Sequence, residues 1–283
     1  MIDLHVHSTF SDGSLTPTQL VERARTVGLK AMALTDHDSM SGLDEFLSAC
    51  REAEGGPIGI PGVEISADVP HGTLHMLGYF MDAHNQAMAG MLRDIREGRR
   101  IRNEKILTKL NEMGLQLSWD EVNAFASHCG DDVVGRPHFA QAMVARGFVS
   151  SHEEAFERYL AKGQPAYTDR FRLSPEESLK IIRGAGGVPV LAHPSTLKLS
   201  NGALRTLVKD LAALGLQGIE VYYSEHSPRQ IQQYLSLARE YALVATGGSD
   251  FHGGLNPAIE LGRGFGSLNV PDEVADELQR RRG

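Results

Sequence analysis

The chain has 283 residues, 28 of them basic and 36 acidic, which gives a net charge of −8 at pH 7 with neutral histidines. This balance argues against a protein that holds long duplex nucleic acid on a broad basic face, although it allows a local basic pocket. The only two cysteines, Cys50 and Cys129, form no C-x-x-C pair, so a disulfide scaffold and a cysteine-based zinc site are excluded. Neither a secretion signal nor an apolar run of about 18 residues is found, so we expect a cytoplasmic protein without membrane contact.

Seven short apolar segments, separated by stretches of helical spacing, are predicted to be β-strands. They are Ile2–His7, Lys30–Thr35, Pro57–Ile65, Thr73–Phe80, Val188–His193, Gln217–Tyr222 and Leu243–Gly247. Between the first two, Leu20, Ala24 and Val27 recur at helical intervals. Thr16 and Pro17 give this helix an N-cap and a first-turn proline. Strands that alternate with helices of this length predict an α/β protein with a parallel sheet or barrel.

The alternation stops between about residues 85 and 167, where no buried strand is predicted. Gln86–Met113 has the pattern of one long helix rich in Arg and Glu. Three shorter helical segments follow, at Ser118–Ala126, Arg136–Arg146 and Ser151–Lys162. A purely helical stretch within an α/β alternation indicates an inserted subdomain. We therefore predict a barrel of residues 1–84 and 168–283 that carries a helical insertion of residues 85–167.

Nearly every predicted strand contains or runs into a residue type that binds metal ions. His5 and His7 alternate on the first strand and therefore project to the same side. The carboxyl ends of parallel barrel strands converge on one rim, so we expect such side chains to meet there. Isolated buried imidazoles and carboxylates are costly, whereas metal ions would satisfy them together, and this donor set without thiolate suits Mn²⁺, Fe²⁺ or Zn²⁺. The predicted metal ligands are His5, His7, Asp12, His37, Glu64, His75, His193, Asp250 and His252.

Five motifs in these segments resemble, in the same order, the signature of the PHP (polymerase and histidinol phosphatase) family of the amidohydrolase superfamily. The motifs are Asp3-Leu4-His5-Val6-His7-Ser8 with Ser11-Asp12-Gly13, Thr35-Asp36-His37, Gly62-Val63-Glu64, Ala192-His193-Pro194 and Gly248-Ser249-Asp250-Phe251-His252. The resemblance implies a distorted (β/α)7 barrel, in agreement with the seven predicted strands. The helical insertion makes the chain similar to the 3′,5′-nucleoside bisphosphate phosphatase branch, whose relatives also trim short RNA from the 5′ end.

The resemblance implies three divalent cations per chain, with manganese expected first and iron or zinc as alternatives. The implied ligand sets are His5, His7 and Asp250 for the first ion, Glu64, His75 and His193 for the second, and Asp12, His37 and His252 for the third, with Glu64 also bridging to the first. Such ions activate water and neutralise phosphoryl oxygens, which suits the hydrolysis of phosphate esters. Glu64 is therefore a predicted catalytic residue.

The resemblance assigns no general acid. His226, in the loop after the sixth strand, is a candidate for protonating the leaving oxygen, and a polar loop residue without catalytic function is the alternative. Asp36 and Glu220 are candidates for orienting the ligand imidazoles.

The insertion is expected to supply substrate specificity. On its long helix, Arg99, Arg102 and Lys105 follow one another at three-residue spacing and are expected to share a face. Arg136 stands at the start of a later helix, where a phosphate can bind to the free N–H groups. A solvated basic face is the alternative, but the resemblance favours substrate contact for Arg102, Asn103, Lys105 and Arg136.

The leading hypothesis is a metal-dependent phosphatase that hydrolyses the 3′-phosphate of nucleoside 3′,5′-bisphosphates and releases the 5′-monophosphate. A 5′-to-3′ exonuclease on short oligoribonucleotides would use the same site. A histidinol-phosphate-type phosphatase comes third, because the basic insertion argues against it. An inactive metal-binding module, like the PHP domains attached to polymerases, is opposed by the intact ligand set. The expected partners are therefore nucleotides or short oligonucleotides, and the sequence does not reveal the oligomeric state.

Overall fold

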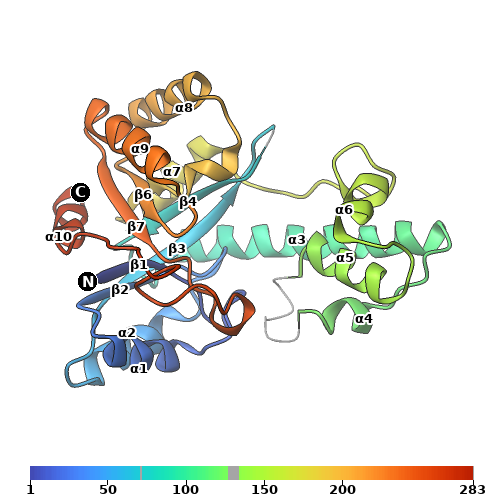
Figure 1. The fold of residues 1–283 in the computed structure, drawn as a ribbon, viewed down its shortest axis with the longest axis horizontal. Helices are drawn as coiled ribbons and strands as arrows, with labels where there is room; N and C mark the ends of the chain where they lie inside the picture. The colour runs from blue at the N-terminus through green and yellow to red at the C-terminus, as the bar shows by residue number, and fades with distance from the viewer. Residues whose placement is uncertain (71, 127–133, 283) are drawn as a thin grey trace. The chain divides into compact units, whose positions relative to one another are not determined.

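The computed structural model describes residues 1–70, 72–126 and 134–282. The chain forms two compact units, Met1–Leu92 with Leu173–Gly283, and Arg93–Arg172 (Figure 1). The second unit begins eight residues and ends five residues later in the chain than the predicted insertion of residues 85–167. Cys50 is a partly buried free thiol, and Cys129 lies outside the described residues. Among the helices in the described ranges, none is long and apolar enough to cross a membrane.

The first unit is built on a seven-stranded sheet whose strands follow one another in chain order. The strands are β1 (Ile2–Val6), β2 (Ala31–Leu34), β3 (Ile58–Ala67), β4 (Leu74–Tyr79), β5 (Val188–Leu191), β6 (Gly218–Tyr223) and β7 (Val244–Gly248), and all seven match predicted segments. The segment after β7 returns to β1, because the N–H of Asp250 donates to the His5 carbonyl at 2.9 Å and the N–H of His7 donates to the Phe251 carbonyl at 3.0 Å. These bonds close the sheet into the predicted α/β barrel.

The expectation of a wholly parallel sheet is wrong at one strand. β4 runs antiparallel to both β3 and β5, whereas the other neighbouring pairs are parallel. Only residues 68–73 separate β3 from β4, too few for the crossover that a parallel pair needs. The reversal places His75, near the start of β4, opposite Ser66, near the end of β3. His75 therefore reaches the same rim as the carboxyl ends of the parallel strands.

Helices cover the strands and close one end of the barrel. In the first unit they are α1 (Pro17–Val27), α2 (Leu43–Glu52), α7 (Pro175–Gly184), α8 (Asn201–Ala213), α9 (Pro228–Glu240) and α10 (Glu273–Arg281), with 3-10 turns at Pro194–Leu197 and Gly253–Leu255. The predicted cap of α1 is confirmed, since the Thr16 side chain accepts from the N–H of Gln19. Val274 and Leu278 of α10 join the barrel core with Ile2.

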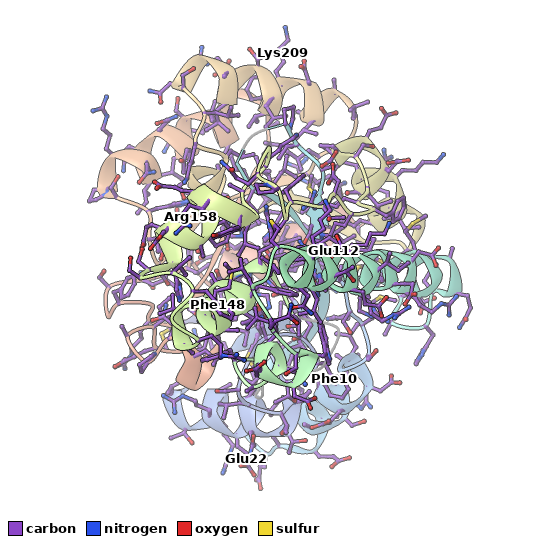
Figure 2. The ribbon with its side chains drawn as sticks, turned by 90° about the vertical axis from the view of Figure 1, so that its right-hand side faces the viewer. Phe10, Glu22, Glu112, Phe148, Arg158 and Lys209 are labelled. Atoms are coloured by element: carbon purple, nitrogen blue, oxygen red, sulfur yellow. The ribbon has the colours of Figure 1, made fainter. Side chains whose placement is uncertain are left out.

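The regular elements in the described residues of the second unit are all helices. Its elements are α3 (Gln86–Glu112), which begins in the first unit, α4 (Trp119–Asn123), α5 (Arg136–Ala145), α6 (His152–Ala155) and a π-helical turn (Phe156–Leu160). The unit has its own apolar core, which includes Ile106, Phe139 and Leu160. In Figure 2 the labels Phe148 and Arg158 mark this unit. An independent core of this kind is expected of a separately packed subdomain.

We expect Gly248→Ala to destabilise the barrel strongly. A Cβ at this position would collide with the backbone N and the Cβ of His5, where β7 meets β1. Because a strand, not a flexible side chain, stands in the way, the loss of unfolding free energy should exceed the about 1–3 kcal/mol of ordinary overpacking. Gly184→Ala is the matched control, since no atom lies within 4 Å of a Cβ there. Thermal unfolding followed by far-UV circular dichroism would compare them, and equal melting temperatures would contradict the expectation.

Candidate metal centre

All nine predicted ligands come together at the rim of the barrel in the first unit. Their donor atoms form four groups, each with members within 4.8 Å of one another: His5, His7 and Asp250; His5, Glu64 and His193; His37, Glu64 and His75; and His7, Asp12, His37 and His252. The residues come from the ends of the parallel strands, from the loops that follow them and from the reversed strand β4.

The first group has the spacing of ligands that share one ion. His5 Nε2 lies 3.3 Å from Glu64 Oε2 and 3.4 Å from Asp250 Oδ1. His7 Nε2 lies 3.4 Å and 3.1 Å from the same two oxygens. Two donors bound to one ion at about 2.1 Å are separated by about 3.0–3.4 Å when the angle between them is 90–109°. The four atoms therefore fit one divalent cation.

Unsatisfied buried atoms support this fit. His5 Nε2, His7 Nε2, His37 Nδ1 and Glu64 Oε2 are buried and make no hydrogen bond of good geometry within the described parts of the chain. A buried polar atom without a partner costs about 1–3 kcal/mol. Cations bound in the donor groups to which these atoms belong would satisfy them.

Glu64 occupies the middle of the centre and is fully buried. Its Oε1 lies 2.7 Å from His75 Nδ1 and 2.9 Å from His193 Nε2. Its Oε2 faces His5 and His7, and also His37 Nδ1 at 2.9 Å. The two oxygens thus face different sets of imidazoles, which is the arrangement that a carboxylate bridging two cations requires. The approach of His37 to Glu64 differs from the predicted grouping, in which His37 belongs only with Asp12 and His252.

Asp12 lies close to the remaining donors, His37 and His252. His252 Nε2 lies 3.2 Å from Asp12 Oδ1, and His37 Nε2 lies 3.5 Å from Asp12 Oδ2. The rings of His7 and His252 stack with their centroids 4.2 Å apart. The ligands predicted for the third ion therefore lie close together, with His7 as an additional neighbour.

A second layer of buried carboxylates holds the ligands in place. Glu220 accepts from His5 Nδ1 at 3.0 Å and from the backbone N–H of His193 at 2.7 Å. Because a carboxylate only accepts, Nδ1 of His5 carries the proton and Nε2 is free to bind a cation. Asp3 accepts from the backbone N–H groups of Ser249 at 2.8 Å and Gly262 at 2.7 Å, which ties β1 to the loop that carries Asp250. Asp3 lies within a recognised motif, but the sequence gives no sign of this bonding.

The expected orienting function of Asp36 is indirect. Asp36 accepts from the N–H of Ser8 at 2.7 Å and from Ser11 Oγ at 2.6 Å, and Ser11 Oγ lies 3.4 Å from His7 Nδ1. Asp36 therefore holds the loop that carries Asp12 and reaches the His7 ring only through Ser11.

The charges within the centre shift the pKa values of its imidazoles in opposite directions. Burial lowers the pKa of His37, but the Glu64 and Asp12 charges outweigh it and raise this pKa to about 10. Burial is likewise outweighed at His252, where Asp12 raises the pKa to about 9. Burial and the nearby charge of His252 lower the pKa of His7 to about 4. In the metal-free centre His37 and His252 are thus protonated at neutral pH, and these protons offset part of the buried negative charge.

His226 lies outside all four donor groups. It is buried, its Nδ1 donates to the Val221 carbonyl at 3.0 Å, and its ring packs on Tyr223 with centroids 4.9 Å apart. Burial lowers the pKa of His226, which counts against a proton donor at neutral pH. Its function as general acid stays a prediction. Tyr223, which the sequence did not single out, reaches the centre instead, because its hydroxyl donates to Asp250 Oδ2 at 3.0 Å.

In the second unit, the predicted substrate residues differ in their burial. Arg102 and Asn103 are buried on α3, whereas Lys105 is exposed on the same helix. Asn103 Nδ2 donates to the Val134 carbonyl at 2.7 Å. Arg102 Nε and Asn103 Oδ1 are buried and have no hydrogen-bond partner among the residues that the structure describes. Two of the four predicted contacts are thus buried polar groups in need of a partner.

Further arginines surround Arg102. Burial and the charges of Arg136, Arg99 and Arg172 lower the pKa of Arg102 to about 9. Arg136 lies over the Tyr167 ring, 5.4 Å from its centroid, and donates to the Leu160 carbonyl at 3.1 Å. Arg102, which its neighbouring guanidinium groups repel and whose Nε has no partner among the described residues, forms a favourable site for an anion such as phosphate. Its spacing predicted Arg99 on the same face of the long helix as Arg102, whereas no sequence pattern indicated Arg172.

A barrel whose strand ends gather imidazoles and carboxylates in this way is that of a metal-dependent hydrolase. The family model of the PHP domain matches residues 3–174. A 3′,5′-nucleoside bisphosphate phosphatase of Chromobacterium violaceum is 36% identical over 89% of this chain and 87% of its own length. A 5′-3′ exoribonuclease of Haemophilus influenzae is 35% identical over 96% of both chains. The chain belongs to the PHP domain family.

Solved structures agree with this assignment. An amidohydrolase from Chromobacterium violaceum, solved with bound sulfate and no metal, has a TM-score of 0.81 and 33% identity over 99% of this chain and 96% of its own. A proposed metal-dependent phosphoesterase from Bifidobacterium adolescentis has a TM-score of 0.80 and 33% identity over 100% and 96%. The predicted enzyme class, a metal-dependent phosphoric ester hydrolase, is confirmed.

We expect cation binding to release protons at neutral pH. His37 and His252, with pKa values raised to about 10 and about 9, carry protons at pH 7 that a cation must displace. The apparent affinity for Mn²⁺ should therefore rise with pH up to about 9–10 and then level off. Calorimetric titration of the chelator-treated protein in buffers of different ionisation enthalpy counts the released protons. A binding heat that is independent of the buffer at pH 7 would contradict this expectation.

Proposed function

We propose that the chain removes the 3′-phosphate from nucleoside 3′,5′-bisphosphates and releases the 5′-monophosphate and phosphate. The observation that carries the proposal is the donor cluster of the first unit, whose nitrogen and oxygen atoms suit the metal ions of a phosphate ester hydrolase. Arg102, buried among other arginines of the second unit, is a second candidate group for a phosphate. The similar Chromobacterium violaceum protein carries the name of this activity.

The residues that would hold the metal ions are those of the cluster. They are His5, His7, Asp12, His37, Glu64, His75, His193, Asp250 and His252. Bound ions would activate water and neutralise the phosphoryl oxygens. Three manganese ions are our proposal for the number and the metal, and iron or zinc suits the same nitrogen and oxygen donors. A cytoplasmic location is likewise a proposal.

The residues of the second unit would hold the phosphate that does not react. Arg102 offers a buried Nε–H that has no partner among the described residues, and Arg136 offers a guanidinium kept in place by the Tyr167 ring. Asn103 Oδ1 is an acceptor and would meet a donor group of the substrate, not a phosphate oxygen. A guanidinium can bind two phosphate oxygens at once, which makes it a better anchor than a flexible ammonium group. Lys105, being exposed, would contribute mainly by charge.

A second candidate function is stepwise removal of nucleotides from the 5′ end of short oligoribonucleotides. It is favoured by the exoribonuclease of Haemophilus influenzae, which matches this chain over 96% of both lengths. The two activities differ in the leaving group and not in the metal chemistry. Incubation with a short 5′-phosphorylated oligoribonucleotide, followed by chromatography of the products, tests this candidate.

We expect Glu64→Gln to abolish turnover and to lower the content of bound metal. The amide cannot replace the charge of a carboxylate whose two oxygens face different sets of imidazoles. The loss of turnover should greatly exceed the about 10–100-fold loss that is typical when a residue that orients a metal ligand is changed. Phosphate release and elemental analysis of the same preparation measure both effects. Near-normal activity with metals bound would refute the assignment of Glu64.

We expect adenosine 3′,5′-bisphosphate to yield AMP and phosphate, and AMP alone to be a poor substrate. Arg136→Ala should lower kcat/KM for the bisphosphate by about 10–100-fold, the equivalent of one charge-assisted contact of about 1.5–3 kcal/mol. The same variant should hydrolyse an aryl phosphate at nearly the wild-type rate. Arg100→Ala is the control, because Arg100 is an exposed arginine paired with Glu97 on α3.

Phosphorus NMR of the products tests the regiochemistry. Accumulation of the 3′-monophosphate would mean that the held and the reacting phosphates are interchanged. An equal loss for both substrates in Arg136→Ala would show that Arg136 does not anchor the second phosphate.

A further inference from the structure

Tyr223, the last residue of β6, contacts the metal centre without offering a ligand atom to it. Its hydroxyl donates to Asp250 Oδ2 at 3.0 Å. The other oxygen, Asp250 Oδ1, faces His7 Nε2 at 3.1 Å and His5 Nε2 at 3.4 Å. The hydrogen bond therefore engages one carboxylate oxygen and leaves the other for a cation.

The ring of Tyr223 contacts a second part of the centre. It packs against the His193 ring with centroids 5.4 Å apart, and His193 belongs to the donor group of His5 and Glu64. It also packs against the His226 ring, with centroids 4.9 Å apart. One side chain thus contacts a member of each of two donor groups that share His5.

The backbone at Asp250 is strained, and contacts of the neighbouring residues hold its side chain in position. Asp250 has a φ of 57°, in the left-handed region that a residue other than glycine occupies at a cost of about 1–3 kcal/mol. Tyr223 is paired with Gly248 across β6 and β7, and Ser224 Oγ donates to the Ser249 carbonyl at 2.7 Å. These contacts hold the backbone of Tyr223 against β7, immediately before the strained residue Asp250. The hydrogen bond from the Tyr223 hydroxyl to Asp250 Oδ2 limits rotation of the carboxylate.

We propose that Tyr223 is a positioning residue of the metal centre. Its hydroxyl holds Asp250 so that only Oδ1 is available to a cation, and its ring sets the position of His193 relative to that carboxylate. Two neighbouring cation positions are thereby kept at a constant separation. The inference rests on the proposed ligand set, in which Asp250 and His193 bind different ions.

Tyr223→Phe tests the hydroxyl, because it keeps the ring against His193 and removes only the bond to Asp250. Calorimetric titration of the chelator-treated, full-length variant with Mn²⁺ should show one class of sites weakened by about 10–100-fold. Turnover should fall at limiting Mn²⁺ and return to near the wild-type value when Mn²⁺ is in excess. A loss of turnover that excess Mn²⁺ does not restore would overturn the positioning function.

Tyr234→Phe is the matched control. Tyr234 is a buried tyrosine whose ring packs on the other side of His226, with centroids 4.8 Å apart, and it belongs to none of the donor groups among the described residues. Loss of its hydroxyl should leave Mn²⁺ affinity unchanged. An equal weakening in both variants would mean that loss of either tyrosine hydroxyl near His226 disturbs the centre, and the specific function of Tyr223 would be refuted.

Asp250→Asn separates this inference from the proposed function on which it rests. If this variant binds Mn²⁺ as the wild type does, the proposed ligand set is wrong, and the inference about Tyr223 is wrong with it. If Asp250→Asn loses a site while Tyr223→Phe binds normally, only the inference fails. Weakening of the same class of sites in both variants supports it.

Discussion

The structure of the first unit depends on buried carboxylates that, within the described ranges, face imidazoles and no lysine or arginine. Glu64 is fully buried, and among the described residues its only ion-pair neighbours are imidazoles. Asp3, Asp36 and Glu220 are also buried, and the hydrogen bonds that they accept come from backbone N–H groups, hydroxyls and an imidazole. Buried carboxylates are tolerated only when they are hydrogen-bonded, paired or bound to metal. The centre is therefore built for cations, and protonated His37 and His252 replace part of their charge in the metal-free chain.

Most of the centre could be predicted because its ligands come from local patterns. A histidine or carboxylate at the end of an apolar segment is visible in the sequence, and barrel geometry brings such ends together. The direction of β4 was missed, because a strand of six residues has the same pattern in either direction. The short connection before it, residues 68–73, was the available signal, since a parallel pair needs a longer crossover.

The contacts behind the ligands could not be predicted. Asp3 meets Ser249 and Gly262, and Tyr223 meets Asp250, across long separations in sequence. Such contacts depend on strand register and on backbone conformations such as the positive φ of Asp250, neither of which has a local sequence signature. Residues that bind the metal are thus easier to recognise than residues that hold those ligands in place.

Along α3, residues at three-residue spacing do not stay on one face of the helix. At 3.6 residues per turn, each three-residue step falls about 60° short of a full turn. Arg99 and Lys105 are therefore about 120° apart around α3, and Lys105 is exposed whereas Arg99 and Arg102 are buried. Asn103, one residue beyond Arg102, remains on the buried side.

The two units thus have complementary electrostatic requirements. The first buries carboxylates that call for cations, and the second buries Arg102 among other arginines, where the mutual repulsion calls for an anion. The buried carboxylates and the buried arginine lie in surroundings of low dielectric constant, where an interaction between opposite charges is stronger than at an exposed surface. A chain of net charge −8 can therefore still offer local sites for the anionic substrate proposed above, because the attraction would come from a few buried groups. The net charge of −8 would repel a long polyanion, which agrees with small nucleotides and short oligonucleotides as the proposed substrates.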